Sequence, residues 1–174
     1  MQHADHVGLI RDAVTAGGTW LELGSGNGAF TLALADLLGP QGTIHSVDTD
    51  RGALSAQAQL VHARFPSIRL HQRTADFTRP LGVGGMDGVL MANSLHFVKD
   101  KAPILGLVRG YLRPGGVFVL VEYDADRGNL WVPHPIGYTT WLSAAPAAGF
   151  SGTRLLGRVP SRFLNSIYAS GSSV

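Results

Sequence analysis

Three glycines at alternate positions follow a short apolar run near the start of the chain. Residues 20–30 read Trp-Leu-Glu-Leu-Gly-Ser-Gly-Asn-Gly-Ala-Phe, and a helix-forming run continues from there to Leu38. Glycine permits positive φ and places no Cβ between the backbone and a ligand. A helix that begins behind such a loop aims free backbone N–H groups into the same space. The spacing of Gly24, Gly26 and Gly28 therefore predicts a strand, a tight loop and a helix around a bound ligand, with a purely structural turn as the alternative.

Glu22 indicates the charge of that ligand. It lies near the end of the apolar run, just before the first glycine of the loop. A carboxylate at this point would repel a phosphate, whereas it would hold an ammonium group with the help of nearby amides. We expect a zwitterionic ligand, such as one with an amino-acid group, in preference to a pyrophosphate.

Two further acidic residues lie at and just after the end of the second predicted strand. This strand, residues 43–48, ends in Asp48, which lies 20 residues beyond Gly28. A carboxylate in that position can accept hydrogen bonds from both hydroxyls of a ribose. Asp50 is placed as the N-cap of a helix over residues 51–65, although the two acids could exchange these roles. The pattern predicts a ligand that contains a ribose.

Candidate proton acceptors gather at the ends of two later strands. A predicted apolar strand that begins at Asp87 leads to His96, and a second over residues 117–121 leads to Asp124 and, after a loop, to His134. Imidazole accepts a proton near neutral pH. His96 is the best candidate for a general base, with Asp124 and His134 as further candidates. A packed or capping histidine is the alternative interpretation of His96.

The segment Glu-Leu-Gly-Ser-Gly-Asn-Gly at residues 22–28 resembles the E/D-x-G-x-G-x-G loop of class I S-adenosylmethionine (SAM)-dependent methyltransferases. Leu-Arg-Pro-Gly-Gly at residues 112–116, before an apolar strand, is also frequent in that family. Asp48, Asp76 and Asp87 lie between these two motifs in the order that the family shows. The resemblance covers residues 19–169.

The resemblance implies a role for each cofactor-binding residue. The glycine loop would surround the methionine part of SAM, and Glu22 would hold its ammonium group directly or through water. Asp48 would bind the ribose, Asp76 would accept from the adenine amino group, and Phe77 would pack on the adenine ring. The implied set is Glu22, Gly24, Ser25, Gly26, Gly28, Asp48, Thr49, Asp76, Phe77, Asn93 and Ser94.

Methyl transfer from SAM to an oxygen, nitrogen or carbon of a small-molecule acceptor is the activity that the resemblance implies, with S-adenosylhomocysteine as the product. In-line positioning and proton removal would be the main tasks of the protein. Residues 93–96 read Asn-Ser-Leu-His, not the Asn/Asp-Pro-Pro-aromatic motif of relatives that methylate adenine or glutamine amino groups. Two alternatives remain: an NAD(P)-binding Rossmann oxidoreductase, because the glycines also fit G-x-G-x-x-G/A, and a non-catalytic SAM-binding protein.

Composition excludes several other classes of protein. The 174 residues include no cysteine, which rules out disulfide scaffolds, thiolate zinc sites and cysteine nucleophiles. No metal-ligand set stands out, although Asp124 and Asp126 could bind a cation. The 14 basic residues are spread along the chain at a net charge of +2, so we expect no nucleic-acid partner. The sequence has no apolar stretch of about 18 residues, the length that a membrane-spanning helix needs, and no signal peptide is evident. We expect a cytoplasmic protein, with a homodimer left open.

These motifs require an α/β fold to position them. We expect one domain over residues 1–174, with a short N-terminal helix at 4–16 and a core at 19–169. The resemblance implies a doubly wound, mostly parallel, seven-stranded sheet with helices on both faces and a C-terminal antiparallel hairpin. The hairpin strands are expected at residues 153–159 and 162–169, after a helix at 139–148, and residues 170–174 are expected to form a frayed tail.

Overall fold

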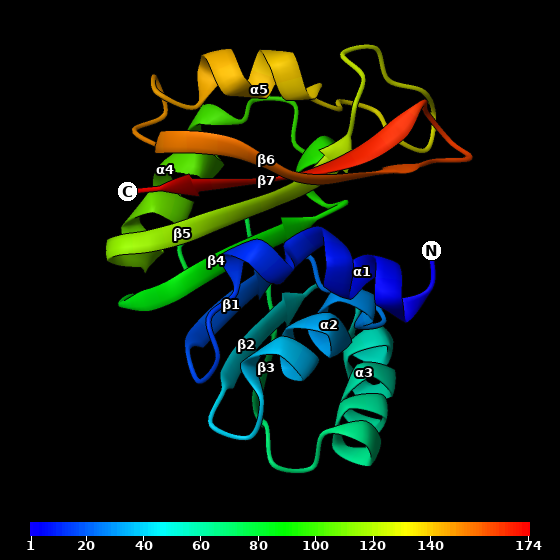
Figure 1. Ribbon diagram of the computed structural model, residues 1–174, viewed down its shortest axis with the longest axis vertical. Coiled ribbons are helices and arrows are strands. Elements are labelled where there is room, and N and C mark those ends of the chain that lie inside the picture. The colour runs from blue at the N-terminus through cyan, green and yellow to red at the C-terminus, as the bar shows by residue number, and fades with distance from the viewer.

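A seven-stranded mixed sheet runs through the computed structural model, which describes residues 1–174 (Figure 1). The strand order is β3-β2-β1-β4-β5-β7-β6. The first five strands are mutually parallel, and β7 is antiparallel to both of its neighbours. The strands are β1 (Thr19–Leu23), β2 (Thr43–Asp48), β3 (Arg69–Thr74), β4 (Met86–Ala92), β5 (Leu112–Tyr123), β6 (Ser151–Pro160) and β7 (Ser166–Ser173). The predicted α/β fold with a C-terminal antiparallel hairpin is confirmed.

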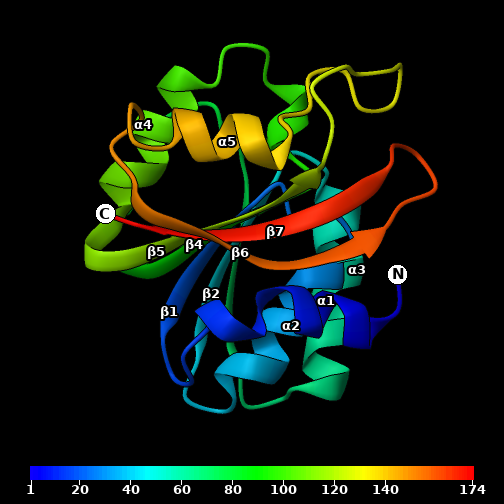
Figure 2. The ribbon, with the colours of Figure 1, turned by 45° about the horizontal axis from the view of Figure 1, so that its top comes forward.

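Helices cover both faces of this sheet, as predicted. The helices are α1 (His3–Ile10), α2 (Ala29–Leu38), α3 (Arg51–Arg64), α4 (Ala102–Tyr111) and α5 (Tyr138–Ala144). Figure 2 shows α1, α2 and α3 on one face and α4 and α5 on the other. Each face has its own apolar core: Phe30 and Leu34 belong to the first, and Val108 and Trp141 belong to the second. No helix combines the length and the apolarity needed to cross a lipid bilayer.

Local chemistry explains where the helices near the glycine loop begin and end. Gly28, with φ of +88°, immediately precedes α2, and Gly39, with φ of +66°, ends it. The carboxylate of Asp50 accepts a hydrogen bond from the backbone N–H of Ala53 at 3.0 Å and caps α3. The N-cap role predicted for Asp50 is therefore confirmed.

The segments that carry the candidate residues meet at one edge of the sheet. The carboxyl ends of the parallel strands point to that edge, where ligands bind in open α/β sheets. The start of α1, the loop at residues 124–137 and the turn between β6 and β7 also reach it, on the right of Figure 1. The fold thus gathers one N-terminal and two C-terminal segments around the ends of β1, β2, β4 and β5.

The N-terminal helix is shorter than predicted. The α-helix ends at Ile10, a 3-10 turn follows over Arg11–Ala13, and Val14 is extended. The guanidinium of Arg154, in β6, donates to the carbonyl oxygen of Asp12 at 3.0 Å. The predicted helix at 4–16 is thus wrong in its second half, where a 3-10 turn and an extended residue replace the α-helix.

The predicted frayed tail is also wrong. Residues 170–173 belong to β7, where Ser170 pairs with Leu120 and Ser173 pairs with Val117 of β5. Ser170 and Ser172 are almost fully buried. The strand begins at Ser166, later than predicted, because residues 161–165 form the turn after β6. Small polar residues gave no apolar pattern from which this strand could be predicted.

Deleting residues 170–174 should therefore destabilise the whole fold. The deletion removes half of β7, the strand through which β6 is joined to β5. We expect the midpoint of thermal unfolding, followed by circular dichroism, to fall by about 10 °C or more, or the chain to fail to fold. An unchanged midpoint would show that these residues are frayed after all.

Candidate functional site

The backbone of the glycine loop adopts conformations that favour glycine. Gly24, Gly26 and Gly28 have φ of +76°, +51° and +88°. A Cβ on Gly24 would lie 2.5 Å from Cβ of Ser94, and one on Gly28 would lie 2.5 Å from Cγ of Gln57. A Cβ on Gly26 would meet no atom within 4 Å. Gly24 and Gly28 are thus required by packing, whereas Gly26 faces open space that a ligand can enter.

A cavity of about 320 Å³ lies beside this loop, within the size range of small-ligand sites. Eight of the eleven predicted cofactor-binding residues line it, together with Phe97. The lining consists of Gly24, Gly26, Asp48, Thr49, Asp76, Phe77, Asn93, Ser94 and Phe97. Glu22, Ser25 and Gly28 do not line this cavity.

The two acids at its edge already accept hydrogen bonds from the backbone. Oδ2 of Asp48 accepts from the N–H of Gly26 at 2.7 Å, and Oδ1 accepts from the N–H of Asp50 at 2.9 Å. Asp76 accepts from both the hydroxyl and the N–H of Thr78, and these bonds lower the pKa of Asp76 below its usual value. Both carboxylates keep further lone pairs with which to bind donors of a ligand.

Glu22 is buried beneath the loop and belongs to a polar network. Its carboxyl accepts a hydrogen bond from the hydroxyl of Thr31, which in turn accepts from the amide of Gln57 at 2.9 Å. Gln57 also accepts from Ser46 at 2.8 Å and from Gln72 at 2.7 Å. Burial raises the pKa of Glu22 to about 8; the bond from Thr31 opposes this shift.

Thr31 and Gln57 were not predicted from the sequence. Both are polar residues on the core-facing sides of helices, at positions where an apolar residue is usual. That mismatch is the one local sign of the network, and it does not reveal which groups are bonded to one another.

His96 forms a buried pair with Glu122 at the end of β5. Nδ1 of His96 lies 3.0 Å from Oε1 of Glu122, whose carboxylate also accepts from the backbone N–H groups of His96 and Tyr123. A carboxylate at this distance can accept a hydrogen bond from an Nδ1–H group, which is the tautomer whose Nε2 carries the lone pair. Only 3% of His96 is exposed, and its ring contacts the rings of Phe97 and Tyr123 at centroid distances of 4.3 and 5.6 Å.

Glu122 is the functional candidate that the sequence analysis missed. It immediately follows Val121, which pairs with Ala92 at the end of β4. His96 follows the same end of β4, so the two side chains meet where adjacent parallel strands finish. The sequence shows an acid at the end of this apolar strand, but the prediction named Asp124, two residues later, as the candidate.

The other two candidate proton acceptors are placed differently. Asp124 accepts from the N–H of Tyr138 at 2.8 Å and forms an ion pair with Arg158 at 2.7 Å. His134 approaches His96 through its backbone N–H, which donates to the carbonyl of His96 at 3.0 Å. None of the three candidates, His96, Asp124 and His134, is among the residues that line the cavity beside the glycine loop.

A second cavity, of about 470 Å³, adjoins the first at Asn93. It lies between α1, the ends of β4 and β5, and the hairpin of β6 and β7. Its lining consists of Met1, Asp5, Asn93, Tyr123, Val159, Pro160, Ser161, Arg162, Phe163 and Ile167. Asn93 has φ of +53°, and its side-chain oxygen is buried without a hydrogen-bond partner. Asn93 thus lines both cavities and carries a buried acceptor that no donor of the protein satisfies.

The raised pKa of Glu22 predicts how stability depends on pH. The folded protein keeps a proton on Glu22 up to about pH 8, whereas the ordinary pKa of this group is 4.5. The contribution of Glu22 to stability should therefore decline as pH rises between these values, by at most about 1.4 kcal/mol per unit. Chemical denaturation of the protein and of Glu22→Gln at several pH values checks this. The variant should gain in relative stability toward pH 8; a difference that does not change with pH would contradict the prediction.

The fold and the sequence are both similar to those of known methyltransferases. A model described as a methyltransferase domain matches residues 21–118. The chain is 35% identical over 113 residues to the hybrid PKS-NRPS synthetase LepA of Aspergillus flavus, a match that covers 61% of this chain and 3% of that protein. It is 30% identical over 118 residues to the ubiquinone/menaquinone biosynthesis C-methyltransferase UbiE of Hahella chejuensis, covering 67% of this chain and 47% of that one.

A solved structure shares nearly the whole fold. The phosphoethanolamine N-methyltransferase 2 of Haemonchus contortus, in complex with S-adenosylhomocysteine, superposes with a TM-score of 0.78 at 14% identity, covering 98% of this chain and 52% of that one. The chain spans less than half the length of the two relatives matched by sequence. With the family match extending over more than half of its residues, the chain belongs to the methyltransferase-domain family and has the class I SAM-dependent methyltransferase fold.

Proposed function

We propose that the protein transfers a methyl group from SAM to a carbon atom of a small-molecule acceptor, with His96 as the general base. The observation that carries this proposal is the buried pair of His96 and Glu122, which lies behind residues that line the two cavities. Phe97 lines the first cavity and Tyr123 lines the second, and both rings contact His96. A base in this position can serve an acceptor that lies next to the cofactor.

The residues around the first cavity suit SAM. Gly24 and Gly26 bring backbone close to the methionine part, and Asp48 offers carboxylate oxygens to a ribose. Asp76 and Phe77 line the same cavity and suit the amino group and the ring of adenine. Glu22, beneath the loop, would lose its proton as an ammonium group binds nearby, because an adjacent positive charge favours the carboxylate. The unpaired side-chain oxygen of Asn93 supplies one more acceptor for the ligand.

A proton must leave the acceptor if it is a carbon acid. Nε2 of His96 takes this proton, and Glu122 stabilises the resulting imidazolium through Nδ1. Bound SAM would supply an electrophilic methyl carbon, which the carbanion would attack in line, with the C–S bond breaking and S-adenosylhomocysteine as the leaving group. Burial of His96 helps here, because water would otherwise compete for the base. Carbon as the acceptor atom also agrees with the name of the Hahella relative.

Cofactor binding can be tested by isothermal titration with SAM, S-adenosylhomocysteine and NAD in parallel. We expect both sulfur nucleotides to bind and NAD to bind at least about tenfold more weakly, since the cavity is lined by the carboxylates of Asp48 and Asp76 and by no basic residue that could hold a pyrophosphate. Asp48→Ala and Gly26→Val should each abolish most of the binding, the second because a β-branched side chain at φ of +51° would enter the cavity. Equal or tighter binding of NAD would reject SAM as the cofactor.

The role of His96 can be tested by substitution. His96→Ala should lower kcat with a β-dicarbonyl acceptor by about 10²- to 10⁴-fold, the usual range for a general base, with little change in the affinity for SAM. Glu122→Gln should lower kcat in the same direction. His62→Ala, which changes an exposed histidine of α3, is the matched control and should leave kcat unchanged. Full activity of His96→Ala would remove His96 from the mechanism.

A further inference from the structure

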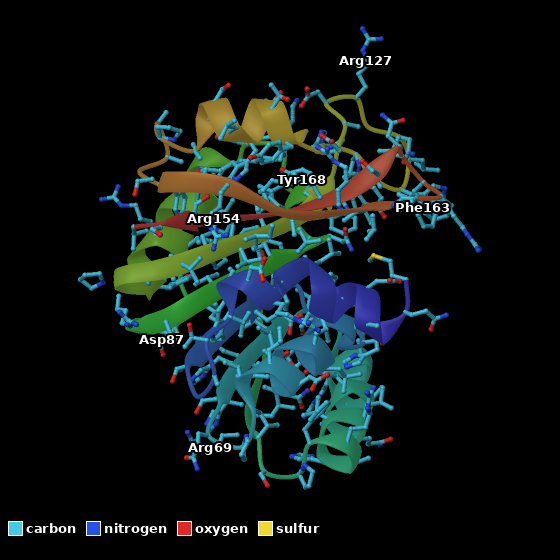
Figure 3. All side chains as sticks on the ribbon, viewed as in Figure 1. Arg69, Asp87, Arg127, Arg154, Phe163 and Tyr168 are labelled. Carbon is cyan, nitrogen blue, oxygen red and sulfur yellow. The ribbon has the colours of Figure 1, made fainter.

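The second cavity has an apolar wall and one charged end. Tyr123 and Phe163 meet edge to face at a centroid distance of 6.4 Å, and Ile167 lies beside them in the lining. Figure 3 shows Phe163 at the tip of the hairpin formed by β6 and β7. Asp5 and Arg162 are the two charged side chains of the lining. Which of them is free to bind a ligand decides the charge that the cavity accepts.

The carboxylate of Asp5 has a structural task. Its Oδ2 accepts a hydrogen bond from the backbone N–H of Gln2 at 2.8 Å and completes the capping box at the start of α1. This bond satisfies part of the carboxylate and fixes its direction. Asp5 thus has a fixed hydrogen-bond partner at the start of the helix that it caps.

Arg162 has no such task, in contrast to the other arginines of the same hairpin. Arg154 donates to the carbonyl of Asp12, and Arg158 is paired with Asp124. Arg162 makes no hydrogen bond or ion pair. The turn around it is nevertheless fixed, because the N–H of Ser161 donates to the carbonyl of Asn165 at 3.2 Å and its hydroxyl accepts from the N–H of Phe163 at 3.1 Å.

We propose that the methyl acceptor is an amphipathic anion whose carboxylate or phosphate group pairs with Arg162. The inference rests on the proposed function, since it places the reacting end of the acceptor near Asn93, where the two cavities join. An apolar segment would lie along Tyr123 and Phe163, and the anionic group would reach Arg162. The exposed guanidinium of Arg162 has no protein partner, so it can form charge-assisted hydrogen bonds with such an anion. A cationic acceptor would instead leave this charge unpaired.

Isothermal titration with four amphiphiles of equal chain length tests the proposal: octanoate, octyl phosphate, octanol and octylamine. Each is added to the free protein and to the protein saturated with S-adenosylhomocysteine. We expect at least one of the two anions to bind about fivefold more tightly than octanol, in keeping with a partly exposed ion pair. The tighter of the two anions identifies carboxylate or phosphate as the preferred group. Octylamine should bind most weakly.

Variants of the arginine make the test specific. Arg162→Gln should remove the preference for the anions, and Arg162→Glu should reverse the order of octanoate and octylamine. Arg127→Gln is the matched control, because Arg127 projects away from the molecule at the top of Figure 3, and it should change nothing. Arg162→Gln and Arg162→Glu change an exposed side chain that makes no hydrogen bond or ion pair, so folding should be preserved.

Three outcomes would overturn the proposal: equal binding of all four amphiphiles, tighter binding of octylamine, which would assign the charged end to Asp5, or an equal effect of Arg127→Gln. Failure of the proposed function has a different signature. In that case S-adenosylhomocysteine would not bind, while the preference of the free protein for anions could still be measured.

Discussion

A buried polar network beneath the glycine loop is the constraint on which the candidate site depends. Glu22, Thr31 and Gln57 come from β1, α2 and α3, and each must find a hydrogen-bond partner because water does not reach them. The network fixes both helices relative to the end of β1. It also explains Gly28, since Gln57 occupies the space where a Cβ would lie. The hydrogen bonds of this network therefore fix the conformation of the glycine loop in the absence of a ligand.

The pairing of β4 with β5 has a comparable effect on the chemistry. Ala92 and Val121 are register partners, so the residues after them leave the sheet together. This brings His96 and Glu122 into contact, although 26 residues separate them in the sequence. The positive φ of Asn93 turns the chain at the same point and leaves an unpaired oxygen between the two cavities. One strand register thus positions the proposed base, its carboxylate partner and the residue shared by the two cavities.

The C-terminal hairpin gives the domain its second cavity. In a sheet that ended at β5, the ends of the strands would be open to solvent on that side. Here β7 inserts between β5 and β6, and the turn after Pro160 reaches back toward α1. The hairpin carries most of the lining of this cavity, including its apolar wall and Arg162. Small serine-rich residues let β7 fit tightly at the centre of this part of the sheet.

The sequence by itself determined the features that depend on local chemistry. Glycine spacing, capping residues and apolar periodicity all act over a few residues. They were enough to predict the glycine loop, the acid at the end of β2, the N-cap of α3 and the order of strands and helices. Only the tertiary structure decided what depends on contacts between distant segments. Such contacts pair Glu122 with His96 and Asp124 with Arg158. They also bind Arg154 to the carbonyl of Asp12 beyond the end of α1, and they place the serine-rich end of the chain in a buried strand. Strand register and long-range side-chain contacts have no local pattern, and for that physical reason the sequence could locate the glycine loop but not the partners of the residues around it.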